Sequence, residues 1–137
     1  MKILQIALTV TAFGVAANAA ETQTYRDSSG RIAGTVTTGG NHAVYRDAQG
    51  RTTATSSVIG STTTYRDARG RVIGTETVNG NHTTCRDAQG RTVYTSTRFG
   101  NTTTFRDARG RVIGTETVNG THATYRDAQG RTRGTKR

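Results

Sequence analysis

Aromatic and apolar positions in this chain recur between polar, glycine-containing segments with a period of 20 residues. An aromatic residue, or once a cysteine, is followed each time by Arg-Asp, and Gly-Arg follows three residues after that Asp. The positions of this aromatic slot are Tyr25, Tyr45, Tyr65, Cys85, Phe105 and Tyr125. Threonine-rich runs such as 61–66 and 71–77 separate the turns, and β-branched threonine favours strands. The pattern predicts an all-β protein of about twelve short strands, because a glycine every ten residues would interrupt any helical stripe.

The Asp-x-x-Gly segments predict one class of turn. Such a segment is typical of a type I turn whose Gly takes the left-handed conformation, which is the usual three-residue hairpin loop with a G1 bulge. The Asp carboxylate can accept a hydrogen bond from a backbone N–H two residues further on. The predicted turn residues are Asp27, Gly30, Asp47, Gly50, Asp67, Gly70, Asp87, Gly90, Asp107, Gly110, Asp127 and Gly130.

A second class of turn lies halfway between these loops. Asn79-Gly80 and Asn119-Gly120 indicate two-residue hairpins of type I′, in which both central residues have positive φ. The corresponding turns elsewhere hold Gly39-Gly40, Ile59-Gly60 and Phe99-Gly100. Because Ile and Phe resist positive φ, another turn type is expected there.

These turns predict to which face of the sheet the equivalent side chains of successive 20-residue units point. If Asp67 pairs with Arg71, then Tyr65 lies opposite Ile73, and pairing across Asn79-Gly80 sends Cys85 to the other face of the sheet. Consecutive units would invert, so the structural period would be 40 residues. Residues that recur every 40 positions agree with this prediction: His42, His82 and His122, and Gln49, Gln89 and Gln129. We therefore expect six β-hairpin repeats in an extended antiparallel meander, with a β-solenoid of one coil per repeat as the alternative.

The first residues are typical of an export signal. Lys2 precedes an apolar run over 3–15, and Ala17-Asn18-Ala19 fits a small-x-small cleavage site. The sequence thus predicts a signal peptide over 1–19 and one β-repeat domain over 20–137, without a transmembrane segment in the mature chain. The expected location is secreted, periplasmic or at the cell surface.

The Asp-x-x-Gly-Arg core resembles the YD repeat of rearrangement-hotspot (RHS) proteins, at Asp27 to Arg31 and its five counterparts. The resemblance implies a secreted or surface protein whose hairpins build long, curling antiparallel sheets. In the family, Tyr stands directly before Asp, whereas here Arg66 intervenes between Tyr65 and Asp67. The chain is more distantly similar to curli-type fibre subunits, as an exported strand–turn–strand repeat.

No reaction is indicated by the sequence. The three histidines lie too far apart in either architecture to share one metal ion, and the aspartates are interpreted as turn anchors. Nucleophile elbows, phosphate loops and paired metal motifs are missing from the sequence, so we expect neither enzyme activity nor a cofactor. Cys85 is interpreted as a small apolar substitute in an aromatic slot, with an intermolecular disulfide as the alternative.

Charge carries most of the functional information. The formal net charge of the chain is +10, and the basic residues beyond Lys2 are arginines apart from Lys136. Guanidinium groups bind phosphate, sulfate and carboxylate through paired hydrogen bonds. The candidate polyanion-binding residues are Arg69, Arg71, Arg109, Arg111, Arg131, Arg133, Lys136 and Arg137.

The charge leads to a hypothesis about function. We expect an exported structural or binding repeat protein of a bacterial envelope or matrix, with acidic polysaccharide, lipopolysaccharide or extracellular nucleic acid as partner. Arginines that only solubilise the surface and protect sheet edges are the simpler interpretation. The alternatives are a self-associating fibre subunit and, more remotely, an ice-binding protein, which paired threonines such as Thr75 and Thr77 suggest.

Overall fold

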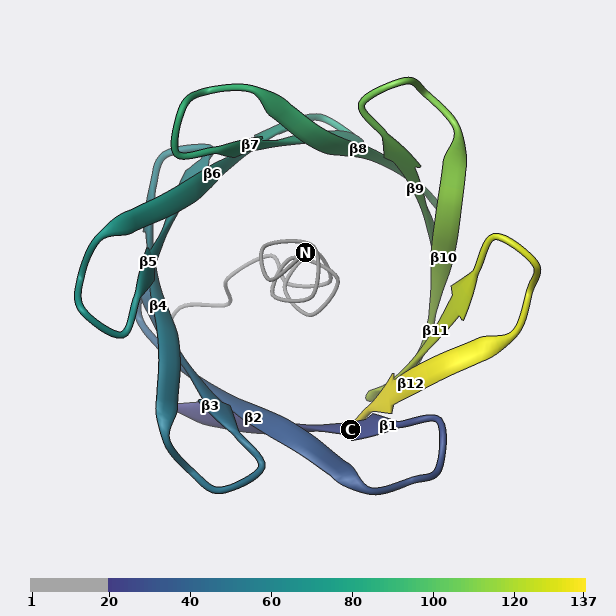
Figure 1. Ribbon diagram of the computed structural model, residues 1–137. Helices are drawn as coiled ribbons and strands as arrows, with labels where there is room; N and C mark the ends of the chain where they lie inside the picture. The colour runs from purple at the N-terminus through teal and green to yellow at the C-terminus, as the bar shows by residue number, and fades with distance from the viewer. Residues whose placement is uncertain (1–19) are drawn as a thin grey trace.

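Twelve antiparallel strands close into a β-barrel in the computed structural model, which describes residues 20–137 (Figure 1). Each strand pairs with its neighbours along the chain, and β1 pairs with β12 to close the barrel. The strands are β1 (Glu21–Asp27), β2 (Ile32–Gly39), β3 (His42–Asp47), β4 (Thr52–Ile59), β5 (Thr62–Asp67), β6 (Val72–Asn79), β7 (His82–Asp87), β8 (Thr92–Phe99), β9 (Thr102–Asp107), β10 (Val112–Asn119), β11 (His122–Asp127) and β12 (Thr132–Lys136).

The barrel confirms the all-β prediction, the antiparallel pairing and the hairpin repeats, but the expected open meander is wrong, and so is the solenoid alternative. The predicted inversion of successive units is wrong as well, because all six residues of the aromatic slot are buried in the barrel interior. The true structural period is 20 residues. With every aromatic slot on one face, curling the sheet around that face buries the whole set and pairs both sheet edges.

A β-bulge after each Asp turn explains why the aromatic residues of successive units point to the same face of the sheet. Asp67 N–H donates to the Arg71 carbonyl as predicted, but Arg66 then pairs with Val72 and Tyr65 pairs with Gly74. Ile73 is therefore an extra residue without a partner in the register. An extra residue shifts every later side chain to the opposite face, which cancels the expected inversion. The same register shift occurs in every hairpin that contains an Asp turn.

The turns at the other end also differ from the prediction by one residue. Asn79 pairs with His82, so the two central residues are Gly80 and Asn81 and not Asn79 and Gly80. Gly80 has φ of 61°, and glycine at the first central position is the requirement of a type II′ hairpin. Ile59 and Phe99 stand just before this position, inside their strands, and so need no positive φ. We call this the Gly-turn end and the opposite one the Asp-turn end.

Large and small side chains alternate around one level of the interior. In strand order the residues are Tyr25, Gly34, Tyr45, Ala54, Tyr65, Gly74, Cys85, Tyr94, Phe105, Gly114, Tyr125 and Gly134. We call the six aromatic members of this set the aromatic layer. Such alternation lets bulky inward side chains share the space inside a barrel.

A second inward level lies nearer the Gly-turn end. The even-numbered strands contribute Val36, Ser56, Glu76, Ser96, Glu116 and Lys136, which we call the polar layer; all six are buried. Threonines such as Thr75 and Thr77 alternate with these inward positions, so they lie on the outer face.

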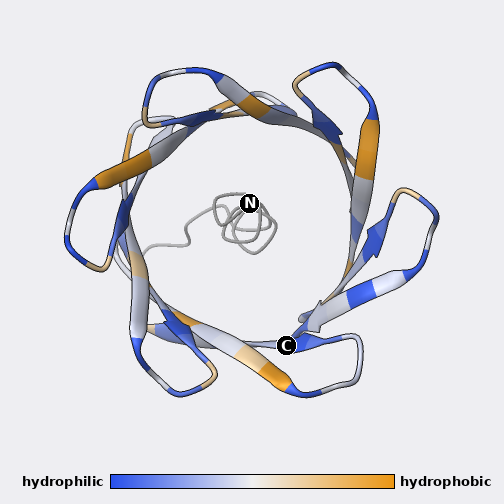
Figure 2. Cartoon of the chain, viewed as in Figure 1, coloured by the Kyte–Doolittle hydropathy of each residue, from blue (hydrophilic) through white to orange (hydrophobic). Residues whose placement is uncertain are grey.

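Short apolar segments follow the Asp turns. Figure 2 shows them in orange at the start of β2, β6 and β10, next to blue hydrophilic loops. Ile73 and Ile113 in these segments pack partly against the buried core, whereas Val72 and Val112 remain 40 % exposed. The bulge positions thus hold some of the few large apolar residues of the chain.

The signal peptide expected over residues 1–19 lies outside the described residues. Within residues 20–137, the structure has no helix long and apolar enough to cross a membrane.

Candidate polyanion-binding rim and interior cavity

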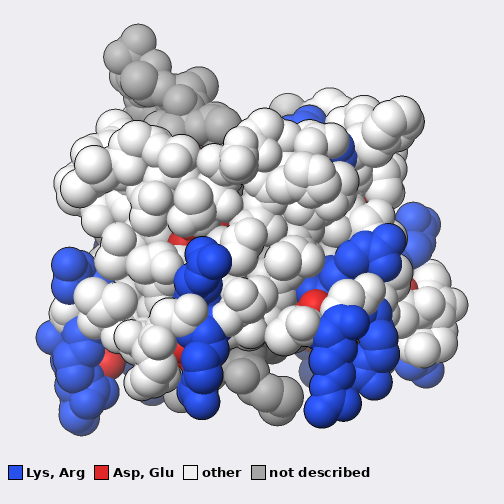
Figure 3. Space-filling model, turned by 90° about the horizontal axis from the view of Figure 1, so that it is seen from above, with Lys and Arg blue, Asp and Glu red and all other residues white. Residues whose placement is uncertain are grey.

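Most arginines of the described chain lie around the Asp-turn end of the barrel. Each 20-residue unit places one Arg before its Asp and another after its turn Gly. Two units add a third inside the turn, and the last unit adds Arg133 two residues beyond Arg131. We call this set the arginine rim: Arg26, Arg31, Arg46, Arg51, Arg66, Arg69, Arg71, Arg86, Arg91, Arg106, Arg109, Arg111, Arg126, Arg131 and Arg133. Figure 3 shows these basic side chains gathered at one end of the barrel, whereas the other end is mostly uncharged.

The formal charge of the described residues is concentrated at this end. Fifteen rim arginines stand against the six turn aspartates, which leaves a charge of +9. The other described charged residues cancel, since three of them are basic and three are acidic: Arg98, Lys136 and Arg137, and Glu21, Glu76 and Glu116. The barrel is therefore strongly polarised along its axis.

The turn aspartates hold the rim in shape. In the turn between β5 and β6, the N–H groups of Arg69 and Arg71 donate to Asp67 Oδ1 at 2.9 and 3.0 Å. The Arg71 guanidinium lies 2.8 Å from Asp67 Oδ2. The backbone hydrogen bond from Arg71 is the main cause that lowers the pKa of the Asp67 carboxyl. The carboxylate therefore stays ionised and fixes both the turn and one arginine, as the sequence predicted for turn anchors.

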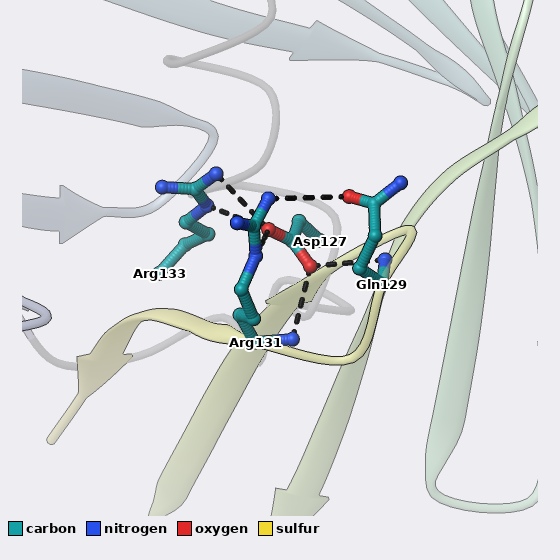
Figure 4. Close-up of polar contacts among 4 residues, drawn as sticks. All are labelled: Asp127, Gln129, Arg131 and Arg133. Carbon is teal, nitrogen blue, oxygen red and sulfur yellow. Dashed lines mark hydrogen bonds and ion pairs between the residues drawn. The ribbon is translucent and has the colours of Figure 1, made fainter.

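The last turn carries an additional arginine (Figure 4). Asp127 Oδ2 accepts hydrogen bonds from Nε of Arg131 at 2.8 Å and Nε of Arg133 at 3.0 Å. Gln129 Oε1 accepts a further hydrogen bond from Arg131 Nη2 at 3.3 Å. Arg133 occupies the bulge position, where the other units have an apolar residue or threonine. The last unit therefore has a charged side chain at this position.

Other rim arginines have no carboxylate partner. Arg66 and Arg106 donate from Nη1 to the carbonyl oxygens of Gly70 and Gly110. Among the described residues, the side chains of Arg69 and Arg109 take part in no hydrogen bond or ion pair. Their guanidinium groups are available to an external anion.

The structure separates the eight predicted polyanion-binding residues into two groups. Six of them lie together on the rim: Arg69, Arg71, Arg109, Arg111, Arg131 and Arg133. The remaining two, expected as a basic tail, belong to the barrel wall. Lys136 is 3 % exposed and points into the interior beside Glu116, because β12 pairs on both sides. Arg137 continues the closing seam through two backbone hydrogen bonds with Thr24.

Sequence reasoning missed the interior ionisable groups. Glu76 accepts hydrogen bonds through Oε2 from the hydroxyls of Tyr65 at 3.2 Å and Tyr94 at 3.3 Å. Burial raises the pKa of Glu76 to about 7, and these two hydrogen bonds act in the opposite direction. Glu116 lies 4.0 Å from the Lys136 ammonium, and burial raises its pKa too. The alternation Gly-Thr-Glu-Thr in β6 and β10 was the available signal, since it places each Glu on the face of the small residue.

Two cavities lie along the barrel axis. One of about 1020 Å³ opens among the Gly turns and is lined by Glu76, Thr83 and Ser96, together with Tyr25, Val36 and Tyr45. The other, of about 1000 Å³, opens at the Asp-turn end and shares those last three residues. A twelve-stranded barrel lies between the eight-stranded barrels that side chains fill and the wider ones that enclose channels.

The described residues contain no group of three or more His, Cys, Asp or Glu side chains placed to hold a metal ion. Comparison with protein-family models, curated protein sequences and solved structures finds no match to this chain.

Proposed function

We propose that this chain is an exported, non-enzymatic binding protein whose arginine rim contacts an extended polyanion. The observation that carries the proposal is the concentration of the whole +9 formal charge of residues 20–137 at one end of the barrel. A charge distributed for solubility alone has no reason to gather on one rim. Acidic polysaccharide, lipopolysaccharide and extracellular nucleic acid are the partner classes with matching charge.

The rim suits repetitive anions. Its arginines recur with the six-unit repeat of the barrel, and guanidinium groups bind phosphate, sulfate and carboxylate in pairs of parallel hydrogen bonds. The aspartates hold Arg71 and its counterparts in fixed positions, whereas Arg69 and Arg109 remain available for a ligand. A pre-ordered ring of this kind reduces the entropy that binding must overcome.

The salt dependence of binding tests the proposal. Residues 20–137 should bind heparin and duplex DNA at low salt, and the logarithm of affinity should fall linearly with the logarithm of salt concentration. Several simultaneous contacts predict a slope of about −4 to −6 for duplex DNA. Isothermal titration calorimetry or fluorescence anisotropy at four salt concentrations measures it.

Two matched pairs of substitutions separate binding from folding. Arg69→Gln with Arg109→Gln should flatten the slope by about 1 to 2 and leave thermal stability unchanged, because these side chains make no hydrogen bond or ion pair in the described part of the chain. Arg71→Gln with Arg111→Gln should flatten the slope similarly but also loosen the turns by removing the bonds to Asp67 and Asp107. Equal binding by the first variant, or no binding of either polyanion at low salt, would refute the proposal.

A further inference from the structure

Two glutamates occupy equivalent places in the polar layer but have different neighbours. Glu76 and Glu116 are 40 residues apart, at the same position of strands β6 and β10. The residue 20 positions beyond Glu116 is Lys136, whose ammonium nitrogen lies 4.0 Å from the Glu116 carboxylate. The residue 20 positions beyond Glu76 is Ser96. The repeat therefore supplies an ammonium group to one carboxylate and leaves a small hydroxyl at the equivalent place beside the other.

The space next to Glu76 is open. Glu76, Thr83 and Ser96 line the cavity of about 1020 Å³ at the Gly-turn end. Thr83 stands where the other repeat has Ala123, and Cys85 stands where it has Tyr125. Near Glu76, Ser96 thus stands in the place of Lys136 and Thr83 in the place of Ala123, so two hydroxyl groups occupy positions where the other repeat has an ammonium and a methyl group.

The Glu76 carboxylate retains an acceptor for a ligand. Tyr65 and Tyr94 both donate to Oε2, and Oε1 accepts no hydrogen bond from the residues that the structure describes. The ionisable groups that interact with it from neighbouring strands are Tyr45, Tyr65, Cys85 and Tyr94, all of which are neutral at physiological pH. Glu21, His42 and Arg98 line the same cavity, but none of them forms a hydrogen bond or ion pair with Glu76 in the described chain. A buried carboxylate without a cation is costly, and an ammonium ligand offsets that cost.

We propose that the cavity at the Gly-turn end binds a small primary amine, with its ammonium group between Glu76 Oε1 and the hydroxyls of Thr83 and Ser96. Tyr25, Val36 and Tyr45 line the same cavity and provide an apolar and aromatic wall for the body of the ligand. The Glu116–Lys136 pair is the internal precedent, because it places an ammonium against a carboxylate at the same level of the same barrel.

This site is separate from the arginine rim. The rim encircles the Asp-turn end and attracts anions, whereas the amine enters among the Gly turns, where the charged residues Glu21 and Arg98 both line the cavity. The two proposals can therefore fail independently.

Benzylamine is a suitable probe, and benzyl alcohol is its neutral counterpart of the same shape. Calorimetric titration of residues 20–137 at pH 8 should show one site for benzylamine and at least tenfold weaker binding of benzyl alcohol. Glu76→Gln should weaken benzylamine binding at least tenfold, whereas Glu21→Gln, at the exposed mouth, should change it less than twofold. Ser96→Lys should abolish binding, because a tethered ammonium then occupies the site as in the Glu116–Lys136 pair.

The pH dependence provides a second measurement. Ammonium binding requires ionised Glu76, whose pKa in the free protein is about 7. Because about half of Glu76 is ionised at pH 7 and about 1 % at pH 5, affinity should fall about 50-fold between pH 7 and pH 5. Glu76→Gln should remove that dependence. Equal binding of the amine and the alcohol, unchanged binding by Glu76→Gln, or a flat pH profile would each overturn the proposal.

Discussion

Tyr94 fills the interior space that Cys85 leaves. The two residues pair directly across strands β7 and β8, and both side chains are fully buried. In other hairpins of this kind an aromatic residue faces a glycine or an alanine, as Tyr65 faces Gly74 and Tyr45 faces Ala54. Here the small residue stands in the aromatic slot and the large one stands opposite, so the packed volume is conserved while its position changes strands. The Tyr94 ring also meets Phe105 edge-on, with 6.0 Å between ring centroids.

This exchange predicts strong coupling between the two positions. Cys85→Tyr alone should destabilise the barrel by about 1 to 3 kcal/mol, because two large side chains compete for one space. Tyr94→Gly alone should cost about 3 to 5 kcal/mol, since it leaves a cavity and removes a hydrogen bond to Glu76. The double variant restores the pairing of the other hairpins and should recover most of this loss. Urea unfolding of all four proteins measures the coupling.

The control for this cycle is a pair of positions that do not touch. Cys85→Tyr combined with Gly34→Ala, on the second strand, should show additive losses. Additive losses for Cys85→Tyr and Tyr94→Gly as well would contradict the volume exchange. The same packing accounts for Cys85 as a buried structural residue, and burial raises the pKa of its thiol to about 12. A thiol of this kind should react with iodoacetamide only after unfolding.

A second prediction concerns the pH dependence of stability. The pKa of Glu76 is about 7 in the folded barrel, against its ordinary value of 4.5 in the unfolded chain. Between these values the folded state holds a proton that the unfolded state has lost, so stability should decrease as the pH rises from about 4.5 to 7. Glu76→Gln should reduce this decrease and stabilise the protein above pH 7 by up to about 3 kcal/mol, whereas the share of Glu116, whose pKa burial also raises, should remain. Thermal unfolding at pH 5, 6, 7 and 8 measures it.

The turn aspartates predict the opposite behaviour at lower pH. The pKa values of Asp47, Asp67, Asp87, Asp107 and Asp127 are lowered in the folded state, for Asp67 and Asp107 mainly by the backbone N–H groups of Arg71 and Arg111. Their contribution is therefore complete above about pH 4 and disappears as the pH falls through the folded values. Asp107→Asn should remove part of the stability loss below pH 4 without changing the slope between pH 5 and 7. An unaltered acid transition in this variant would contradict the assignment.

The sequence predicted the hairpins because the information for them is local. Asp67 and Gly70 determine a loop through a side-chain hydrogen bond and a positive φ, and neither depends on distant strands. Closure of the barrel is different, since it requires that the aromatic residues of all the hairpins point to the same face of the sheet. One extra residue, Ile73 in its hairpin, reverses the face to which every later side chain points, and nothing in the identity of an isoleucine marks a bulge.

The candidate sites follow the same division. The charge of the rim and the position of Arg69 and Arg109 in turns were readable from the sequence. The interior pair Glu116 and Lys136 was not, because it requires knowing that β12 pairs with both β11 and β1. A terminal Lys in a basic segment is ordinarily exposed, and only the closed barrel turns it inward.

The closing seam allows the barrel to be tested directly. Arg26 and Thr135 are register partners on β1 and β12, although they lie at opposite ends of the described chain. Arg26→Cys with Thr135→Cys should therefore form a disulfide within one chain, since paired strands bring their Cβ atoms within bonding reach. An open sheet keeps these positions far apart, and a fibre would join them between chains. Non-reducing electrophoresis distinguishes a compact cross-linked monomer from a ladder of oligomers.

The matched control is Thr35→Cys with Arg46→Cys, which stand in the same register between β2 and β3. This pair belongs to one hairpin and should cross-link in an open or a closed sheet alike. Buried Cys85 should remain reduced in both proteins. If only the control pair closes within the monomer and the seam pair links separate chains, the strands belong to an assembly and the fibre alternative gains support. If both pairs close within the monomer, both edges of the sheet are occupied by the chain itself, and an edge-to-edge fibre lacks the free strand it needs.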